Sequence, residues 1–390
     1  MKVASFGRAA AILSVASLAL VACGDDNGDG GNDAEENGST TENGANGGGE
    51  GGEAGGDLAG AEDVSGDYYG GGASSHETAM LEWIFAFEEQ SGGAAVEYAS
   101  VGSGNGRSGF LSGEYQFAGS DAAMSSEEYE ESTSQCGPDG AFHLPTYIAP
   151  IGVAVNVDGI DENLNLDADT LASIFSGEIT SWDDEAIAEH NEGVDLPSTP
   201  ITVVHRQDNS GTTENFTEYL EQASSNWEWE ASGDWPSEIT SESAEGTGGV
   251  IGLAADIDGA VTYADAGRID DNFVMVNVEV GGEYTELSPE AAATAVGASD
   301  RVEGGAPNDM AFEIARDTEE LGAYPIVQIA YTIWCNEYPS QEEADFAQAF
   351  AAYIVSEDAQ NLASDLAGSA PISDELRDEA LEAISQISAG

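Results

Sequence analysis

Hydrophobic and polar positions follow two periods along the chain, from about residue 65 to the C-terminus. Runs rich in β-branched and aromatic residues predict strands at residues 96–101, 147–157, 201–205, 260–264, 273–280 and 326–335. Apolar positions at helical spacing predict helices at residues 77–89, 168–175, 184–190, 212–223, 248–256, 343–355 and 359–366. This alternation is typical of α/β folds with mostly parallel sheets. About 325 residues are many for a single core, so we expect two domains.

Residues 1–22 have the pattern of a signal peptide. Lys2 and Arg8 precede an apolar run at residues 9–22, which is short for a membrane-spanning helix. The run ends in Leu-Val-Ala-Cys-Gly, which resembles the bacterial lipobox and implies that Cys23 is lipidated. A plain cleaved signal with an incidental cysteine is the alternative. No later stretch is long and apolar enough to span a membrane.

Residues 23–65 consist mostly of Gly, Asp, Glu and Asn. Such a segment cannot bury enough apolar surface to offset the entropy of ordering it. We therefore predict a disordered acidic tether that begins at the lipidated Cys23.

The charge of the chain excludes several partners. Its 75 acidic and 8 basic residues give a formal net charge of -67. Such a field repels nucleic acid and anionic lipid surfaces, so we expect membrane contact only through the lipid anchor. An acid-coated chain whose one lysine is Lys2 is tolerated in high salt, because counter-ions screen the repulsion. A melting temperature that rises with salt is the expected consequence.

Two cysteines remain after Cys23. Cys136 and Cys335 are an even pair in an oxidising compartment, which favours a disulfide over two buried free thiols. The four histidines show no metal-ligand spacing, so we predict no metal and no cofactor; they are His76, His143, His190 and His205.

Four polar loops beside predicted strands and helix starts carry the candidate chemistry. They are residues 71–76, 101–107, 119–125 and 205–213. In the last loop, Ser210 is a good N-cap for the next helix, and the free N–H groups of its first turn form an anion site. Arg206 lies shortly before Ser210, and its guanidinium can donate two parallel hydrogen bonds to a tetrahedral oxyanion. Asp208 could orient this guanidinium. A capped helix with a surface arginine is the alternative for this loop taken alone.

Together the loops resemble the phosphate-binding proteins of bacterial ABC transporters. The matching motifs are GGGAS at residues 70–74, VGSGNG at 101–106, AGSDAAMS at 118–125 and RQDNSGT at 206–212. The resemblance covers nearly all of residues 68–370. It implies a two-lobed, periplasmic-binding-protein-like α/β fold of type II, with mixed sheets flanked by helices and a ligand cleft between lobes joined by two hinge strands. Lobe I would comprise residues 66–148 and 328–390, and lobe II residues 149–327.

The resemblance also implies the ligand shell. Matched motif by motif, the phosphate-binding residues are Ser74, Ser75, Ser103, Asp121, Arg206, Ser210, Gly211 and Thr212. Ser75 stands where relatives often carry an aromatic residue, so we expect only its backbone N–H to be used. Arg107 follows the second loop and points either toward the ligand or to the surface.

The function implied is capture, not catalysis. We expect a monomeric lipoprotein on the outer face of the cell membrane that binds inorganic phosphate and delivers it to permease subunits of an ABC transporter. Asp121 would accept the O–H of hydrogen phosphate, whereas sulfate offers it no proton near neutral pH. The alternatives are a receptor for another tetrahedral oxyanion, a phosphate sensor, and a phosphate-hydrolysing enzyme supported only by the weak spacing of His205 and Ser210.

Overall fold

The computed structural model describes residues 60–297, 299–302, 304–367 and 370–390, and these residues belong to one compact unit. The predicted signal peptide, the lipidated Cys23 and most of the predicted tether lie outside the described residues. The described part of the tether, residues 60–65, contains the 3-10 helix η1 (Ala61–Asp63) and a buried Val64. Within the described part of the chain, no helix is long and apolar enough to cross a membrane.

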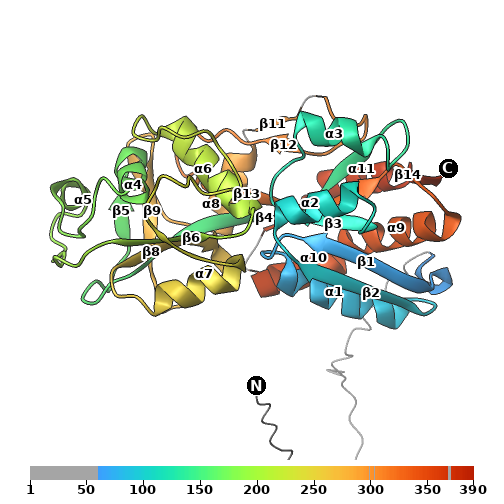
Figure 1. Cartoon of the computed structure of the whole chain (residues 1–390), viewed down its shortest axis with the longest axis horizontal. Coiled ribbons are helices and arrows are strands. Elements are labelled where there is room, and N and C mark those ends of the chain that lie inside the picture. Colours follow the sequence, from blue (N-terminus) through green and yellow to red (C-terminus); the bar gives the residue numbers. More distant parts are fainter. Residues whose placement is uncertain (1–59, 298, 303, 368–369) are drawn as a thin grey trace, which may run out of the picture. The chain divides into compact units, whose positions relative to one another are not determined.

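Strands and helices alternate along most of the chain (Figure 1). The strands are β1 (Gly66–Gly72), β2 (Ala94–Ser100), β3 (Phe117–Ser120), β4 (Ala141–Asn156), β5 (Leu164–Leu166), β6 (Thr202–Arg206), β7 (Glu242–Ala244), β8 (Ala260–Asp265), β9 (Val274–Val280), β10 (Glu283–Thr285), β11 (Asp300–Arg301), β12 (Phe312–Glu313), β13 (Val327–Cys335), β14 (Glu337–Tyr338), β15 (Ala370–Pro371) and β16 (Ser388–Ala389). The helices are α1 (Glu77–Gln90), α2 (Ser103–Leu111), α3 (Ser126–Ser132), α4 (Ala168–Phe175), α5 (Glu185–His190), α6 (Gly211–Ala223), α7 (Gly246–Ala255), η2 (Ala266–Arg268), α8 (Pro289–Gly297), α9 (Gln341–Ile354), α10 (Glu357–Ala367) and α11 (Asp374–Ile384). Every predicted strand and helix is confirmed, with ends that differ by a few residues.

The main sheet is mixed, as the family resemblance implies, whereas the mostly parallel pairing suggested by the alternation of elements alone is wrong. Its 12 strands follow the path β2-β1-β3-β13-β4-β8-β6-β7, with β5, β9, β10 and β15 attached beside it. Strand β1 runs parallel to β2 and β3, and β6 runs parallel to β8. The central strands β4 and β13 are antiparallel to each other and to their other neighbours β8 and β3, which reverses the direction in the middle of the path.

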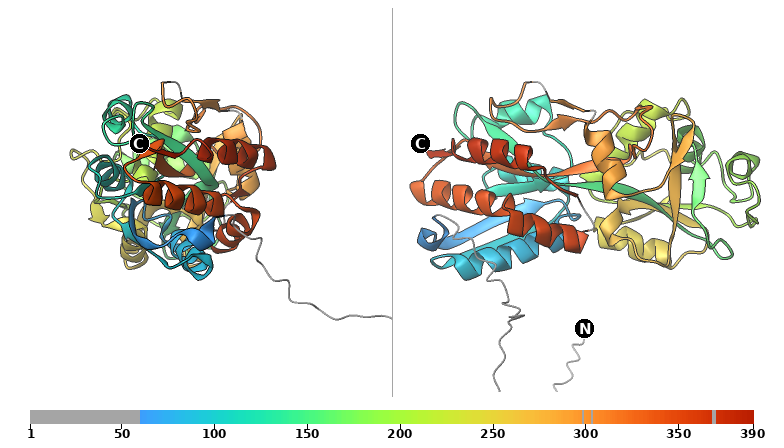
Figure 2. Two further views of the ribbon diagram at one scale, coloured as in Figure 1. Left: turned by 90° about the vertical axis from the view of Figure 1, so that its right-hand side faces the viewer. Right: turned by 180° about the vertical axis from the view of Figure 1, so that it is seen from behind.

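Two hydrophobic cores lie along this sheet. Core 1 gathers side chains of α1, β3, the first part of β4, β13 and α9, and core 2 gathers side chains of the second part of β4, α4, α6, β8 and β9. Helices α1, α9 and α10 contact one another and cover core 1 (Figure 2). The 16-residue strand β4 is buried along almost its whole length, because it supplies side chains to both cores.

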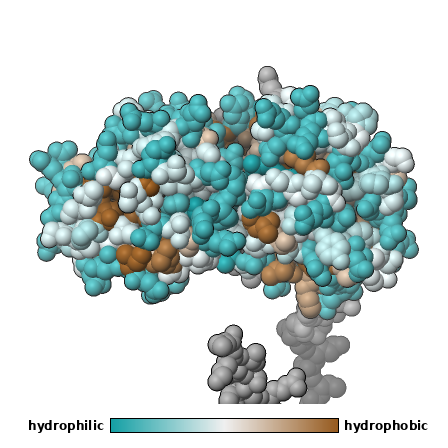
Figure 3. Space-filling view, in the orientation of Figure 1, coloured by the Kyte–Doolittle hydropathy of each residue, from teal (hydrophilic) through white to brown (hydrophobic). Residues whose placement is uncertain are grey.

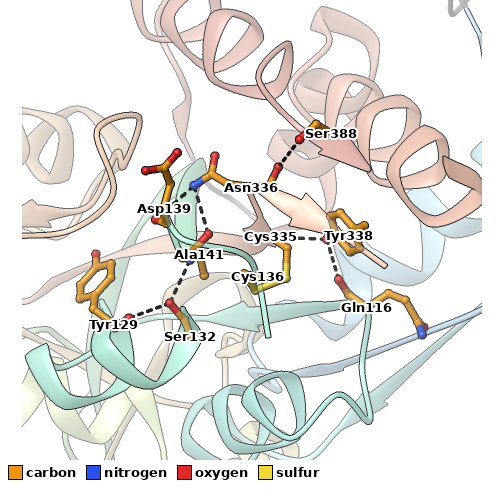
Figure 4. The surroundings of a disulfide bond; sticks show 11 residues. Gln116, Tyr129, Ser132, Cys136, Asp139, Ala141, Cys335, Asn336, Tyr338 and Ser388 are labelled. Atoms are coloured by element: carbon orange, nitrogen blue, oxygen red, sulfur yellow. Dashed lines mark hydrogen bonds between the residues drawn. A yellow bond between two sulfur atoms is a disulfide. The ribbon is translucent and has the colours of Figure 1, made fainter. Parts of the chain in front are cut away.

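A disulfide joins Cys136, after α3, to Cys335 at the end of β13, as the sequence predicts. The two Cα atoms are 4.5 Å apart, within the range that a disulfide spans without backbone movement. Hydrogen bonds from Asn336 to the carbonyl of Gly140 and from the Cys335 N–H to the Tyr338 hydroxyl hold the surrounding chain (Figure 4). The bond closes a loop of 199 residues.

Glycines let strand β1 lie close to its neighbours. A Cβ atom at Gly70 would lie 2.2 Å from the Phe117 ring, and one at Gly72 would lie 1.9 Å from the Gly119 carbonyl oxygen. The side chains that usually favour a strand are therefore excluded from this part of β1, which explains why the strand is not predicted from the hydrophobic pattern.

Candidate phosphate site

The candidate site lies where the ends of five elements meet. The turn after β1 supplies Ser74 and Ser75, the start of α2 supplies Ser103, and the end of β3 leads to Asp121. The remaining residues come from the end of β6 and the start of α6. The seven predicted residues that carry side chains are each at most 6% exposed; they are Ser74, Ser75, Ser103, Asp121, Arg206, Ser210 and Thr212. The eighth, Gly211, is also buried.

The Asp121 carboxylate is the centre of the hydrogen-bond network. The Ser75 hydroxyl lies 2.8 and 2.7 Å from its two oxygens, and the Thr212 hydroxyl lies 3.3 Å from Oδ2. The Asp121 backbone N–H donates to the Ser103 hydroxyl at 3.2 Å. Asp121 is thus in direct contact with three other predicted residues. The two that are farthest apart in the sequence, Ser75 and Thr212, are separated by 137 positions.

Glycine is required at position 211. A Cβ atom there would lie 2.6 Å from the Ser103 Oγ and 2.8 Å from the Asp121 Cβ. Both distances are shorter than any ordinary carbon contact, so a larger residue would push α6 away from β3 and α2. The absence of a side chain keeps the first turn of α6 against Asp121.

The first turn of α6 is capped as the sequence predicts. The Ser210 hydroxyl accepts a hydrogen bond from the Thr213 N–H at 3.3 Å, and the Glu214 N–H donates to the Ser210 carbonyl. Gly211 and Thr212 hold the first two N–H groups of the helix, which no carbonyl of the helix itself can accept. These donors and the positive end of the helix dipole favour an anion at this point.

Arg206 is the positively charged side chain among the predicted ligands. Its Nε donates to Asp208 Oδ1 at 2.9 Å and its Nη2 donates to Oδ2, so the carboxylate holds the guanidinium plane from one side. Its Nη1 lies 3.4 Å from the Thr247 hydroxyl, which also contacts the Ser74 hydroxyl at 3.0 Å. Asp208 therefore orients Arg206, and Thr247 links it to the turn after β1.

The ion pair keeps Asp208 ionised. Burial alone would raise the pKa of this carboxyl, but the hydrogen bond and charge of Arg206 outweigh burial and hold the pKa below its ordinary value. The Gly246 N–H donates a further hydrogen bond to Asp208 Oδ1 at 2.9 Å.

Two contacts at the site are not predicted by the sequence reasoning. His76 is fully buried, and its Nε2 lies 2.9 Å from Asp121 Oδ1. The Ser75 hydroxyl binds Asp121, although only the Ser75 backbone is expected to take part. The position of His76 directly after Ser75 is the one sequence signal that could have placed it at the site.

Arg107 is buried but is held by glutamates. Its Nε donates to Glu128 at 2.9 Å, its Nη1 donates to the Ser120 hydroxyl at 3.1 Å, and its Nη2 lies 3.6 Å from Glu214. The surface alternative is therefore wrong: Arg107 is buried and joins α2, α3 and α6 beside the site. It lines a recess of about 390 Å³ together with Asp121 and the buried Arg316.

One group of described residues has the composition of a cation site. Asp167, His190 and Glu279 bring one ligand atom each within 4.8 Å of the others. Asp167 already caps α4 through the Thr170 N–H, and the His190 imidazole already contacts both Asp167 and the Tyr284 hydroxyl. These contacts account for the group without a metal ion.

The fold has counterparts among known proteins. A family model described as a PBP superfamily domain matches residues 59–358, which defines the class of the protein. Phosphate-binding protein PstS 2 of Mycobacterium tuberculosis is 31% identical over 399 residues, covering 100% of both chains. Phosphate-binding protein PstS 3 of Mycobacterium leprae is 34% identical over 287 residues, covering 72% of this chain and 76% of the relative.

Solved structures share the fold at lower identity. A high-affinity periplasmic phosphate-binding protein bound with phosphate (PfluDING) has a TM-score of 0.64 and 20% identity, covering 80% of this chain and 92% of the other. A phosphate ABC transporter substrate-binding protein with bound phosphate from Clostridium perfringens has a TM-score of 0.56 and 17% identity, covering 79% and 100%. The chain belongs to the PBP superfamily and, within it, to the family of the PstS phosphate-binding proteins. The resemblance drawn from the four sequence motifs is confirmed.

Proposed function

We propose that this protein binds inorganic phosphate outside the cytoplasm and delivers it to the permease subunits of an ABC transporter. Its PstS relatives are named for phosphate binding, and their similarity extends over the whole chain in the case of PstS 2. The ligands we propose are Ser74, Ser75, Ser103, Asp121, Arg206, Ser210, Gly211 and Thr212.

The observation that carries the proposal is the hydrogen-bond count at Asp121. An ionised carboxylate offers about four acceptor positions. Three donor groups reach it, namely the Ser75 hydroxyl, the His76 imidazole and the Thr212 hydroxyl. One acceptor position remains for a proton of the ligand, which hydrogen phosphate supplies and sulfate does not.

The proposed lobes follow the two cores, except that Met310 of lobe II packs in core 1. We propose that lobe I comprises residues 66–148 and 328–390 and lobe II residues 149–327, with β4 and β13 as the hinge strands. Hydrogen bonds from Asn215 to the Asp121 carbonyl at 2.6 Å and between Ser74 and Thr247 would then join the lobes in a closed state. Release of phosphate would require these contacts to open by a hinge motion.

The membrane attachment rests on the sequence alone. We propose a signal peptide at residues 1–22, lipid on Cys23, and a tether that keeps the monomeric binding domain near the membrane. Hydrophilic residues cover most of the face in Figure 3, as befits a domain that reaches the membrane only through its anchor.

The arrangement argues against hydrolysis. In a Ser-His-Asp triad the imidazole lies between the other two groups and takes the serine proton. Here the Asp121 carboxylate lies between the Ser75 hydroxyl and the His76 imidazole. A carboxylate held in this way accepts hydrogen bonds and does not activate Ser75 through His76.

Calorimetric titration in high salt near pH 8 tests the proposal. A soluble form lacking residues 1–23 is titrated with inorganic phosphate and then with excess sulfate. We expect one-to-one binding of phosphate and no heat from sulfate. Binding of both anions would indicate a general oxyanion receptor, and binding of neither would refute the proposed ligand.

A further inference from the structure

His76 is the donor at Asp121 that cannot turn away. Its side chain is fully buried, and its ring packs beside Tyr147 with centroids 5.7 Å apart. The Ser75 and Thr212 hydroxyls also donate to Asp121, and the enclosed imidazole has no room to turn toward another acceptor. The contact of 2.9 Å between Nε2 and Asp121 Oδ1 is therefore a fixed feature of the site.

The protonation pattern of His76 follows from its two ring nitrogens. An ionised carboxylate only accepts hydrogen bonds, so Nε2 must carry the hydrogen in this contact. The other nitrogen, Nδ1, is buried and has no hydrogen-bond partner among the described residues. It faces Gly119, where an added Cβ would lie 2.8 Å from it. A bare lone pair is tolerated there better than an unpaired N–H, which favours the neutral imidazole with hydrogen on Nε2.

We propose that His76 is a specificity-determining residue that permanently occupies one acceptor position of Asp121 and so restricts the site to the singly protonated phosphate dianion. This inference rests on the proposed function. The doubly protonated monoanion carries two O–H donors and needs two acceptors. Without the His76 donor, Asp121 would regain a second acceptor position.

Other titratable groups surround His76 and Asp121, and their effect on the pH dependence must be distinguished from that of His76. They are Tyr98 on β2, Tyr147 on β4, Asp265 at the end of β8, Arg268 in η2, and Arg206 with Asp208 after β6. Among them, Asp265 is the group to control, because burial and then the charge of Asp121 raise its pKa to about 7. Its titration falls in the same pH range as that of phosphate.

The test is the pH dependence of phosphate affinity in three proteins. Wild type, H76L and H76Q are titrated with inorganic phosphate between about pH 5.5 and pH 8.5, each also in a D265N background. Leucine removes the donor at similar size, whereas the glutamine amide retains an N–H at a similar distance from the backbone. Thermal melts confirm that each variant is folded.

We expect the wild-type affinity for total phosphate to fall roughly tenfold per pH unit on the acid side of the second phosphate pKa. H76Q should follow the same slope, and H76L should lose most of it because it also binds the monoanion. The D265N background should leave this contrast unchanged.

Two results would overturn the assignment. The first is a wild-type phosphate affinity that is equal at both ends of the pH range, which excludes the role of His76 even if H76L does not fold. The second is an H76L affinity that changes with pH as steeply as that of wild type. Absence of phosphate binding to wild type at every pH would overturn the proposed function together with this inference, so the two failures are distinguishable.

Discussion

Replacing Arg206 with alanine should remove most of the phosphate affinity. A guanidinium has five N–H donors. Two of them are bound by Asp208, and one on Nη1 points toward the Thr247 hydroxyl at 3.4 Å. Two donors therefore remain for the ligand.

The magnitude follows from this count. Charge-assisted hydrogen bonds contribute about 1.5–3 kcal/mol each, so two of them contribute about 3–6 kcal/mol. At about 1.4 kcal/mol per factor of ten, R206A should weaken binding by roughly two to four powers of ten. Loss of Arg206 also leaves the buried Asp208 carboxylate unpaired, and its charge would repel the anion.

Isothermal titration calorimetry of four variants separates these contributions. R206A is compared with D208N and with the double variant R206A/D208N, which removes the unpaired charge. R301A is the matched control, because Arg301 is an arginine whose ion pair with Glu379 is partly exposed. We expect R301A to bind like wild type and the double variant to recover part of the loss. A folded R206A whose Kd lies within tenfold of wild type would refute the placement of Arg206 at the ligand.

Three further predictions concern selectivity and stability. D121N should lower the ratio of phosphate to sulfate affinity by at least about tenfold, since an amide can donate to sulfate; competition titrations measure this ratio, and an unchanged ratio contradicts the role of Asp121. Burial, and next the charge of Asp121, raise the pKa of Asp265 from 3.8 to about 7, so the native state holds a proton that the unfolded chain releases. Stability should therefore fall as pH rises between these values, and D265N should melt higher than wild type at about pH 8 but not at about pH 4; equal melting shifts at both would be inconsistent with this. Loss of the Cys136–Cys335 bond in the double serine variant should cost about 2–5 kcal/mol of unfolding free energy in denaturant titrations, and no change would mean that the cross-link does not restrict the unfolded chain.

The hydrophobic pattern predicts most of the apolar elements and misses β1 and α2, whose glycines interrupt it. Strands β8, β9 and β13 carry continuous or alternating apolar side chains, and their predicted bounds agree closely with the structure. Strand β1 ends in three glycines, and helix α2 contains Gly104, Gly106 and Gly109, so neither has an apolar period to detect. In α2, a Cβ at Gly106 would lie 2.3 Å from the Gly72 Cα, so backbone proximity, not propensity, determines this helix.

The same distinction applies to the site. Ser74, Asp121 and Arg206 belong to motifs that the sequence displays, and the structure brings these motifs together. His76 reaches the site by contacting Asp121, which is 45 positions away in the sequence. Thr247 reaches it by contacting Arg206, which is 41 positions away. No local pattern encodes those contacts, because they depend on how β1, β3 and α7 pack.

The charge of the site explains how an anion binds to a chain with a net charge of -67. Arg206 is balanced by Asp208, and Asp121 adds a second buried carboxylate, so the ionised side chains of the proposed ligand shell have no net positive charge. Attraction over long distances cannot be the source of affinity, since the whole surface repels the ligand and salt screens charges beyond about 10 Å. Hydrogen-bond donors at fixed positions must supply it instead: the first N–H groups of α6, two N–H groups of Arg206, and hydroxyls held by their neighbours. A site built in this way selects by the number and direction of protons on the ligand, and it can therefore function on a strongly acidic protein.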